Sequence, residues 1–264
     1  MKKTFLHVLI IGMAIVLLSS VNANADDKNT LVSITADYWM PSLDMEVKSS
    51  ELAVIGSTVD LIDDLGLDDS ENVPAFRGSI DLPFLPELLI SYFNIDGSAT
   101  KTITKNLTYK GITYTATNSV SSSYDITQAE ALLAFNLLNA EAGKLGLLVG
   151  AKYFEVETTL KDNTAIVNKS EEVNGPVPVV GVIGAIKLPH KFRLEAMARG
   201  LSIEIDDVKA ALYDIEASIN YDFNKFLRAS AGYRYFLING EDTKNKDEVD
   251  IKFAGPYVGV TGSF

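Results

Sequence analysis

The sequence predicts an all-β protein, an up-and-down antiparallel transmembrane β-barrel of about ten strands. Three observations carry this prediction: long segments that alternate apolar and polar residues, an N-terminus typical of export, and a last segment that alternates up to a final aromatic residue. Short links join the segments at one end and, apart from a short link near Glu204 to Asp207, long polar links at the other, as in transmembrane barrels. Eight strands are the alternative if two weaker segments belong to loops, and twelve if 108–117 pairs within the membrane.

The clearest alternation lies between Ala211 and Leu237. One apolar set runs from Tyr213 to Phe223, and after a break at 224–226 a second runs from Leu227 to Tyr235. This period of two predicts a hairpin. Its strands are longer than the ~5–6 residues usual in soluble proteins and match the ~9–11 that cross a bilayer at a tilt.

The same pattern predicts eight further strands. They lie at about Thr30–Met40, Pro74–Leu82 and Leu88–Ser98, in segments ending near Phe135 and at Leu188, in segments starting near Leu145 and at Phe192, and at about Val249–Phe264. The long links, expected to be extracellular loops, are 41–73, 99–121, 160–174 and 239–248.

The N-terminus predicts export. Lys2 and Lys3 precede an uncharged run from Phe5 to Leu18, and Ala23-Asn24-Ala25 supplies a cleavage site, as in a secretory signal peptide. We therefore expect residues 1–25 to be removed and residues 26–264 to form the barrel domain. The chain has no cysteine, which excludes disulfides and a lipidated N-terminal cysteine. Its net charge of −12 argues against nucleic acid, which requires a basic surface.

The last segment is expected to close the barrel against the strand that starts near Thr30, because an open sheet edge cannot persist in hydrocarbon. Val258, Val260 and Phe264 share one face of this closing strand, whereas Pro256 and Gly262 weaken its apolar pattern. The segment resembles the terminal strand of bacterial outer-membrane barrels.

Charged residues within the predicted strands fall on the polar faces. Because an Arg or Lys facing lipid at mid-membrane costs ~2–4 kcal/mol, we expect these side chains inside the barrel. The predicted inward set is Arg77, Asp81, Lys152, Glu195, Arg199, Asp214, Glu216, Arg228 and Arg234. Barrels of eight to ten strands leave little open space, so pairing across a side-chain-filled interior is favoured over a narrow water-filled path.

Aromatic residues gather at two levels, which is typical of interfacial girdles. Near the long links these are Tyr38, Trp39, Tyr153, Tyr233 and Tyr235, and near the short links Phe84, Phe135, Phe192, Tyr221, Phe223 and Phe264.

Four stretches carry a wider resemblance: Asp60–Asp68, Gly175-Pro176, Gly232-Tyr233-Arg234, and Ala254–Tyr257 leading to Phe264. In these the chain resembles a family of small proteobacterial outer-membrane β-barrel proteins of undefined function. The resemblance implies a bacterial outer-membrane location, contact with outer-membrane lipids and lipopolysaccharide, and recognition of the last strand by the barrel-assembly machinery. It implies no catalytic residue.

Residues suited to chemistry are scarce. After position 25 there is one histidine, His190, in a short link, so Ser-His catalysis lacks its base and no enzyme activity is expected. No cofactor motif is present. An acidic segment with Asp60, Asp63, Asp64, Asp68 and Asp69 offers oxygen donors for Ca²⁺ but lacks the spacing of a calcium loop, so a solvated surface turn is the preferred interpretation.

The sequence thus predicts an integral outer-membrane barrel with a structural or surface-interaction role. One alternative is a narrow channel or porin for small solutes. Another is a soluble periplasmic lipocalin-like barrel, in which the apolar faces would point inward.

Overall fold

The computed structural model describes residues 31–48, 50, 57–81, 85–109, 111–163 and 167–264. The predicted signal peptide and Phe84 lie outside these residues. No described segment is a helix long and apolar enough to cross a bilayer. Apart from a 3₁₀ turn, η2 (Pro189–Lys191), the regular structure of the described chain consists of β-strands.

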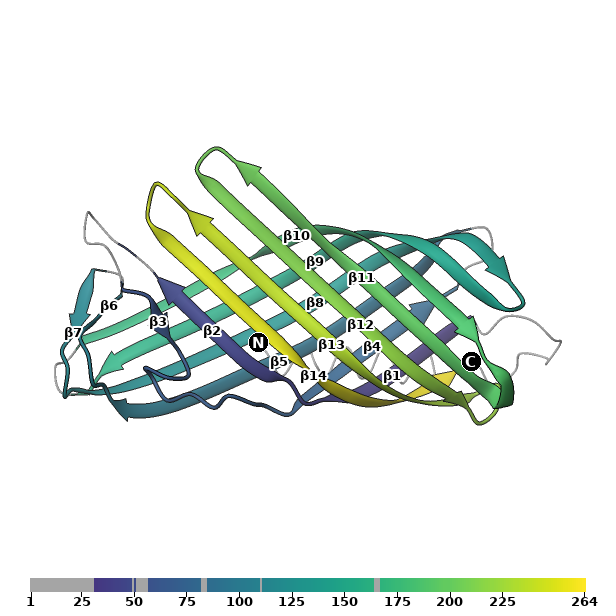
Figure 1. Ribbon diagram of the computed structural model, residues 1–264, viewed down its shortest axis with the longest axis horizontal. Helices are drawn as coiled ribbons and strands as arrows, with labels where there is room; N and C mark the ends of the chain where they lie inside the picture. The colour runs from purple at the N-terminus through teal and green to yellow at the C-terminus, as the bar shows by residue number, and fades with distance from the viewer. Residues whose placement is uncertain (1–30, 49, 51–56, 82–84, 110, 164–166) are drawn as a thin grey trace.

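Ten antiparallel strands form a closed barrel (Figure 1). They are β1 (Val32–Trp39), β4 (Val73–Ile80), β5 (Glu87–Thr102), β8 (Ser119–Ala140), β9 (Gly143–Asp162), β10 (Val167–Lys187), β11 (Phe192–Ile205), β12 (Val208–Asp222), β13 (Leu227–Asp242) and β14 (Asp247–Ser263). Each strand pairs with the next, and β1 pairs with β14 from Ser33↔Ser263 to Trp39↔Tyr257. The predicted fold class is therefore confirmed.

The two ends of the barrel differ. One, here called the short-turn end, holds the links at 141–142, 188–191 and 223–226. The opposite end, here called the mouth, holds the long connections before β4 and before β8, the short links at 206–207 and 243–246, and strands that project unequally (Figure 1).

Strands continue into the ranges predicted as long loops. Beyond Met40-Pro41 the chain forms β2 (Ser42–Lys48), which extends the line of β1 along β14, and β3 (Val59–Asp60) pairs briefly with β2. In β2 the apolar residues Leu43, Met45 and Val47 alternate with polar ones, so the period of two is present in the sequence. The segment is predicted as a loop because its outward residues are polar, unlike those of a membrane strand. β6 (Leu107–Tyr109) and β7 (Ile112–Tyr114) pair only with each other, so the 108–117 segment adds no strand to the barrel.

The acidic segment after β3 folds into the mouth. The Asp60 carboxylate accepts hydrogen bonds from the backbone N–H groups of Ile62 and Asp63, both at 2.8 Å, and Gly66 reverses the chain at φ +77°. This turn places three leucines in the apolar core, while its acidic side chains stay at the surface. The leucines are Leu61, Leu65 and Leu67.

The outer face carries an uncharged apolar band. On β12 the outward residues from Tyr213 to Tyr221 alternate with buried or half-buried polar ones, and the outward residues of β11 from Phe192 to Gly200 are likewise uncharged. Large apolar side chains such as Val149 remain about half exposed. Because the apolar faces point outward, the lipocalin-like alternative is wrong.

Aromatic side chains border the band at both levels. Exposed rings include Tyr38, Tyr153 and Tyr213 towards the mouth and Phe135, Phe192, Phe223 and Phe264 towards the short turns. Tyr233, predicted near the long links, pairs with Ala217 and lies at the middle of the band. Trp39 is an exception to the predicted girdle. It is 1% exposed and its indole N–H donates to the Gly255 carbonyl inside the barrel, because adjacent strand residues face opposite sides.

The position of Trp39, the single tryptophan, can be tested by fluorescence. We expect blue-shifted emission and little quenching by lipids with brominated acyl chains, since the ring is buried inside the barrel. A Tyr38→Trp/Trp39→Phe variant moves the indole to the outer face and serves as the matched control, and its emission should be strongly quenched. Equal quenching of both proteins would contradict the assigned faces.

The outer band also predicts that the cost of a charged substitution depends on its depth in the membrane. Ala217→Arg places a charge at the middle of the band and should lower the free energy of unfolding by ~2–4 kcal/mol, whereas Ala211→Arg, on the same face near the mouth, should cost ~0–1 kcal/mol. Denaturant unfolding of the two variants in lipid vesicles measures the difference. Equal losses would be inconsistent with a membrane-embedded band.

Candidate functional site

An ion-pair network crosses the barrel interior. It joins eight charged residues from β1, β4, β8, β9, β11, β12 and β13, four acidic and four basic, so the formal charges cancel. These residues are Asp37, Arg77, Glu130, Lys152, Arg199, Asp214, Glu216 and Arg234, and all except Arg77 have less than a tenth of their surface exposed.

Asp214 lies at the centre of the network. Its Oδ2 atom is 2.8 Å from Lys152 Nζ, 2.9 Å from Arg199 Nη2 and 2.7 Å from Arg234 Nη2, and its Oδ1 accepts from Arg234 Nε at 3.0 Å. β9 and β12 are separated by two strands, so the contact between Lys152 and Asp214 must cross the interior. Three cations thus surround one carboxylate that is fully buried.

The remaining contacts join both neighbouring strands and strands that are not neighbours. Arg199 donates to Glu130 at 2.8 Å and to Glu216 at 2.9 Å. Arg77 binds Asp37 through two hydrogen bonds of 2.6 and 3.0 Å and reaches Glu216 at 3.3 Å. Each of the four cations therefore pairs with two or more carboxylates, or with both oxygens of one carboxylate. Such compensation is what makes buried charge tolerable.

An aromatic layer covers the network on the mouth side. Trp39, Phe93, Phe236 and Phe253 form edge-to-face and stacked contacts with ring centroids 5.7–6.4 Å apart. The Arg234 guanidinium carbon lies 5.0 Å from the Trp39 ring and 5.1 Å from the Phe93 ring, which places a cation over aromatic faces. The layer joins the charged network to the apolar core of the mouth.

Little space remains between these groups. A cavity of about 10 Å³ lies beside Asp37, Trp39, Arg77 and Glu216, which is room for about one water molecule. At this level the described side chains fill the barrel.

A second charged cluster lies near the short-turn end. Arg193 and Arg228 both contact Glu195 and Asp222, and these four side chains are 23–32% exposed. Because water reaches them, their pairing contributes less than that of the buried network.

The structure places eight of the nine predicted inward residues in two separate charged clusters. The buried network holds Arg77, Lys152, Arg199, Asp214, Glu216 and Arg234, and the lower cluster holds Glu195 and Arg228. Asp81 does not lie on an inward strand face. It is exposed just after β4, which ends at Ile80, so the alternation used to place it does not reach it.

Two network members were absent from the predicted set. Asp37 lies between Ala36 and Tyr38, and Glu130 lies between two alanines, so both occupy polar positions of alternating segments. The alternation could have identified them. Gln128, also fully buried, accepts from Lys152 Nζ at 3.3 Å and could have been found in the same way.

The calcium candidates do not converge on a common point. Asp60 caps its own turn, and the Asp64 carboxylate pairs with Lys105 at 2.8 Å and accepts from the Asp60 N–H. Among the described residues, no group of three or more acidic or histidine side chains is arranged to hold a metal ion.

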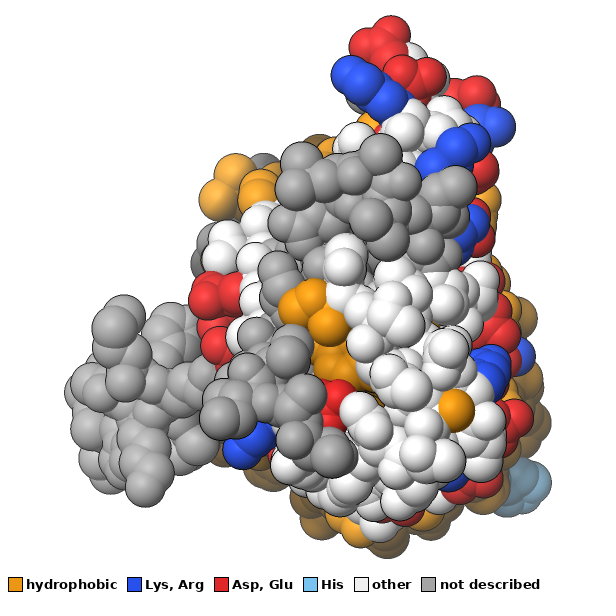
Figure 2. All heavy atoms as spheres, turned by 90° about the vertical axis from the view of Figure 1, so that its left-hand side faces the viewer, with side chains coloured by type: hydrophobic (Ala, Val, Ile, Leu, Met, Phe, Trp, Pro, Cys, Tyr) orange, Lys and Arg blue, Asp and Glu red, His pale blue; other side chains and the backbone are white. Residues whose placement is uncertain are grey.

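His190 is exposed in η2 at the short-turn end. Figure 2 looks onto the mouth, where described acidic and basic side chains gather on projecting tips. In one tip, at Asp242, backbone N–H groups of Asn245 and Lys244 donate to the carboxylate and lower its pKa. The Asp242 carboxylate is therefore harder to protonate than a free aspartate.

No protein-family model matches the chain, and no curated protein is found to be similar. Among solved structures, the outer-membrane protease OmpT from Escherichia coli is 12% identical, with 92% of this chain and 100% of that chain covered and a TM-score of 0.54. The translocator domain of the autotransporter NalP from Neisseria meningitidis is 14% identical over 100% and 98% of the chains, with a TM-score of 0.47. At such identity the likeness to OmpT concerns the fold, which is that of outer-membrane β-barrels.

The network predicts a contrast between two aspartates. Asp214→Asn removes the charge shared by three buried cations and should cost ~3–5 kcal/mol of unfolding free energy, because those cations lose their compensation. Asp222→Asn, in the partly exposed lower cluster, should cost about 1 kcal/mol or less. Denaturant unfolding in vesicles compares the two, and a larger loss at Asp222 would contradict the assigned burial.

Proposed function

We propose that the protein is an integral outer-membrane barrel with a sealed interior and a structural or surface-interaction role, rather than an open channel. The observation that supports this most directly is the ion-pair network with its aromatic cover. It connects seven of the ten strands, so it ties the walls of the barrel together.

Conduction would require a continuous water path through this level. The residual cavity of about 10 Å³ is too small for more than one water molecule. A permeating ion would have to separate buried pairs such as Lys152 and Asp214, and breaking one buried pair costs ~3–5 kcal/mol. A narrow channel is thus the less favoured candidate.

The outer surface supports a location in a membrane. The uncharged band and the two levels of aromatic rings fit the hydrocarbon and its interfaces. A shallow apolar depression of about 920 Å³ on the same face, lined by Ala196, Ala217 and Ala231, offers a smooth surface to acyl chains. The resemblance of the Asp60–Asp68 segment to a proteobacterial outer-membrane family is consistent with this location.

The proposed partners follow from the same surfaces. Outer-membrane lipids contact the band, and lipopolysaccharide meets the acidic mouth through divalent cations. The barrel-assembly machinery recognises the closing strand, whose Val258, Val260 and Phe264 side chains are exposed on the outer face. No enzyme activity is proposed, since His190 lies at the end opposite the mouth.

Planar-bilayer recording tests the sealed interior. Purified wild-type protein should insert without discrete conductance steps, because its interior is filled. A Trp39→Ala/Asp214→Ala/Arg234→Ala/Phe236→Ala variant removes parts of both layers and should raise the ion leak.

Heat-modifiable migration in SDS gels serves as the folding control for both proteins. Stepwise conductance from folded wild-type protein would refute the sealed barrel and favour the narrow channel.

A further inference from the structure

The apolar depression on the outer face of the barrel has a floor of small residues. One row of outward residues crosses the strands from Leu145 on β9 through Gly184, Ala196 and Ala217 to Tyr233 on β13. The three residues in the middle of this row have no side chain beyond a Cβ atom. A Cβ atom added at Gly184 would come no closer than 3.8 Å to a heavy atom outside the adjoining residues, so the protein leaves the space above this row open.

Larger side chains border this row on both sides. Towards the short-turn end the next outward row holds Ile186, Leu194 and Ile219, and towards the mouth the next row includes Val182 and Ile215. Rows on one face of a sheet are ~7 Å apart and neighbouring strands ~4.8 Å apart. The resulting trough measures ~13 Å between the bordering rows of backbone and ~19 Å from β9 to β13. This elongated shape, with a volume of about 920 Å³, suits a hydrocarbon chain.

The short-turn side of the depression leads to three aromatic rings and a lysine. Beyond Leu194 the next outward residues are Phe192 and Tyr221, whose ring centroids are 5.1 Å apart, and the ring of Phe223 lies 5.0 Å from that of Tyr221. Lys191 Nζ donates to the Phe223 carbonyl at 3.1 Å, which holds this cation beside the rings. Along β11 these rings are ~13 Å from the floor of the depression.

The outer surface beside these rings is basic. Lys225 lies in the adjoining 223–226 link, with its Nζ 4.9 Å from the centre of the Phe226 ring, and both Lys191 and Lys225 are exposed. The acidic residues of β11 and β12 near this end, Glu195 and Asp222, occupy interior positions and pair with arginines. The two lysines are therefore placed to meet an anion that approaches from the lipid.

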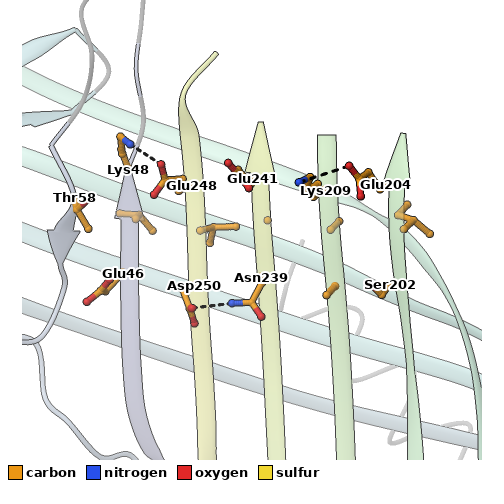
Figure 3. Close-up of a pocket in the computed structure, with 16 residues that line it drawn as sticks. Glu46, Lys48, Thr58, Ser202, Glu204, Lys209, Asn239, Glu241, Glu248 and Asp250 are labelled. Atoms are coloured by element: carbon orange, nitrogen blue, oxygen red, sulfur yellow. Dashed lines mark hydrogen bonds and ion pairs between the residues drawn. The ribbon is translucent and has the colours of Figure 1, made fainter. Parts of the chain in front are cut away.

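The mouth end of the outer face is acidic instead. Figure 3 shows the ends of β2, β11, β12, β13 and β14 there, where five acidic residues stand against two lysines. Both lysines are paired, Lys48 with Glu248 and Lys209 with Glu204. An anionic headgroup is consequently repelled at the mouth and attracted at the short-turn end.

We propose that the depression and the two lysines together bind one anionic glycerophospholipid. One acyl chain lies over Gly184, Ala196 and Ala217, and the phosphate meets Lys191 and Lys225 at the level of the aromatic rings. The distance along β11 matches a headgroup at the interface and a chain that reaches the middle of the band. This inference deepens the proposed function and rests on it, because it names a lipid that the outer face of a sealed barrel selects.

A second copy of the chain is the other occupant that an apolar depression offers. In a two-fold dimer the same surface of each subunit meets its counterpart. Since both barrels would cross one membrane in the same direction, equal residues would lie at equal depth. Lys191 and Lys225 of the two copies would then approach each other, and like charges at an interface are unfavourable. A phosphate instead compensates both lysines.

Native mass spectrometry of the folded barrel in non-ionic detergent tests the site. The probe is phosphatidylglycerol. Zwitterionic phosphatidylcholine with the same acyl chains is the charge control, and lipid A is the second phosphate-bearing lipid. We expect one phosphatidylglycerol per barrel to be retained, with a Kd about fivefold lower than that of either other lipid, because its charge and its shape both fit the site.

Filling the depression separates the contact with the acyl chain. Ala196→Leu/Ala217→Leu occupies the floor and should weaken phosphatidylglycerol binding about tenfold. The matched control is Ala36→Leu/Ala131→Leu, at exposed outward positions of β1 and β8 outside the depression, and it should change the Kd less than about twofold.

Removing the lysine charges separates the contact with the headgroup. Lys191→Gln/Lys225→Gln should weaken phosphatidylglycerol binding about fivefold and leave phosphatidylcholine binding unchanged, so that the selectivity is lost. Lys244→Gln/Lys246→Gln removes two exposed lysines at the mouth and serves as the charge-matched control, for which the selectivity should be that of wild type.

Heat-modifiable migration in SDS gels identifies the folded variants. The proposal is overturned if folded wild-type protein retains no lipid, if phosphatidylglycerol binds no more tightly than both other lipids, or if the filled or the lysine variant keeps wild-type affinity. Dimers without retained lipid that the filled variant abolishes would also overturn it and would identify the second copy as the occupant. Conductance of the same preparations is recorded in parallel. A non-conducting barrel without a retained lipid refutes the lipid site alone, while stepwise conductance refutes the sealed barrel.

Discussion

The whole structure depends on one constraint, the need to satisfy every backbone N–H and C=O group within the hydrocarbon. Lipid offers no hydrogen-bond partner, so a sheet that crosses it must close on itself. Here β14 meets β1 over the stretch from Ser263 to Tyr257, which seals the wall. Closure also determines the direction of the side chains, because a closed wall gives each strand one face towards lipid and one towards the interior.

The interior follows from closure and from strand number. With ten strands the enclosed space is narrow enough for side chains to fill, and the polar face of every strand has to find partners there. Four cations and four carboxylates solve this problem without net charge, and Asp214 is the common acceptor for three of the cations. A network of this kind adds less to stability than its number of contacts suggests, since desolvation offsets much of the attraction. Its clearer effect is to specify which strands face each other across the barrel.

Sequence alone predicted much of the fold because the alternation of apolar and polar residues and the position of charged residues both reflect a closed wall in lipid. The prediction was less reliable for segments outside the membrane, where this constraint does not apply. β2 carries the period of two, with Leu43, Met45 and Val47 facing inward, but it was not predicted as a strand because its outward residues are polar, as expected beyond the lipid. Tyr38 and Trp39 show a second limit: both are aromatic near a strand end, yet their adjacency sends one outward and the other into the interior.

The sequence predicts most residues of the ion-pair network, but it does not predict which of them pair with each other. Alternation assigns Lys152, Arg199 and Asp214 to the interior, whereas the partners across the barrel depend on strand tilt and register, which no local pattern encodes. The same holds for the pairing between β10 and β11, which stops at Val180↔Gly200. Gly175-Pro176 is visible in the sequence, but its meaning requires the register that would set Pro176 against Glu204.

The extent of pairing between β10 and β11 shows where the backbone no longer has to be paired within the wall. Pairing between β10 and β11 stops at Gly200, whose neighbour on β12 is the outward aromatic Tyr213. Below that level an unpaired edge would leave polar groups in lipid, and above it water can satisfy them. Closure is thus obligatory for the embedded part of the barrel and optional for the projecting strands. Pro176 and Pro178 lie just beyond this boundary, where unpaired backbone is tolerated.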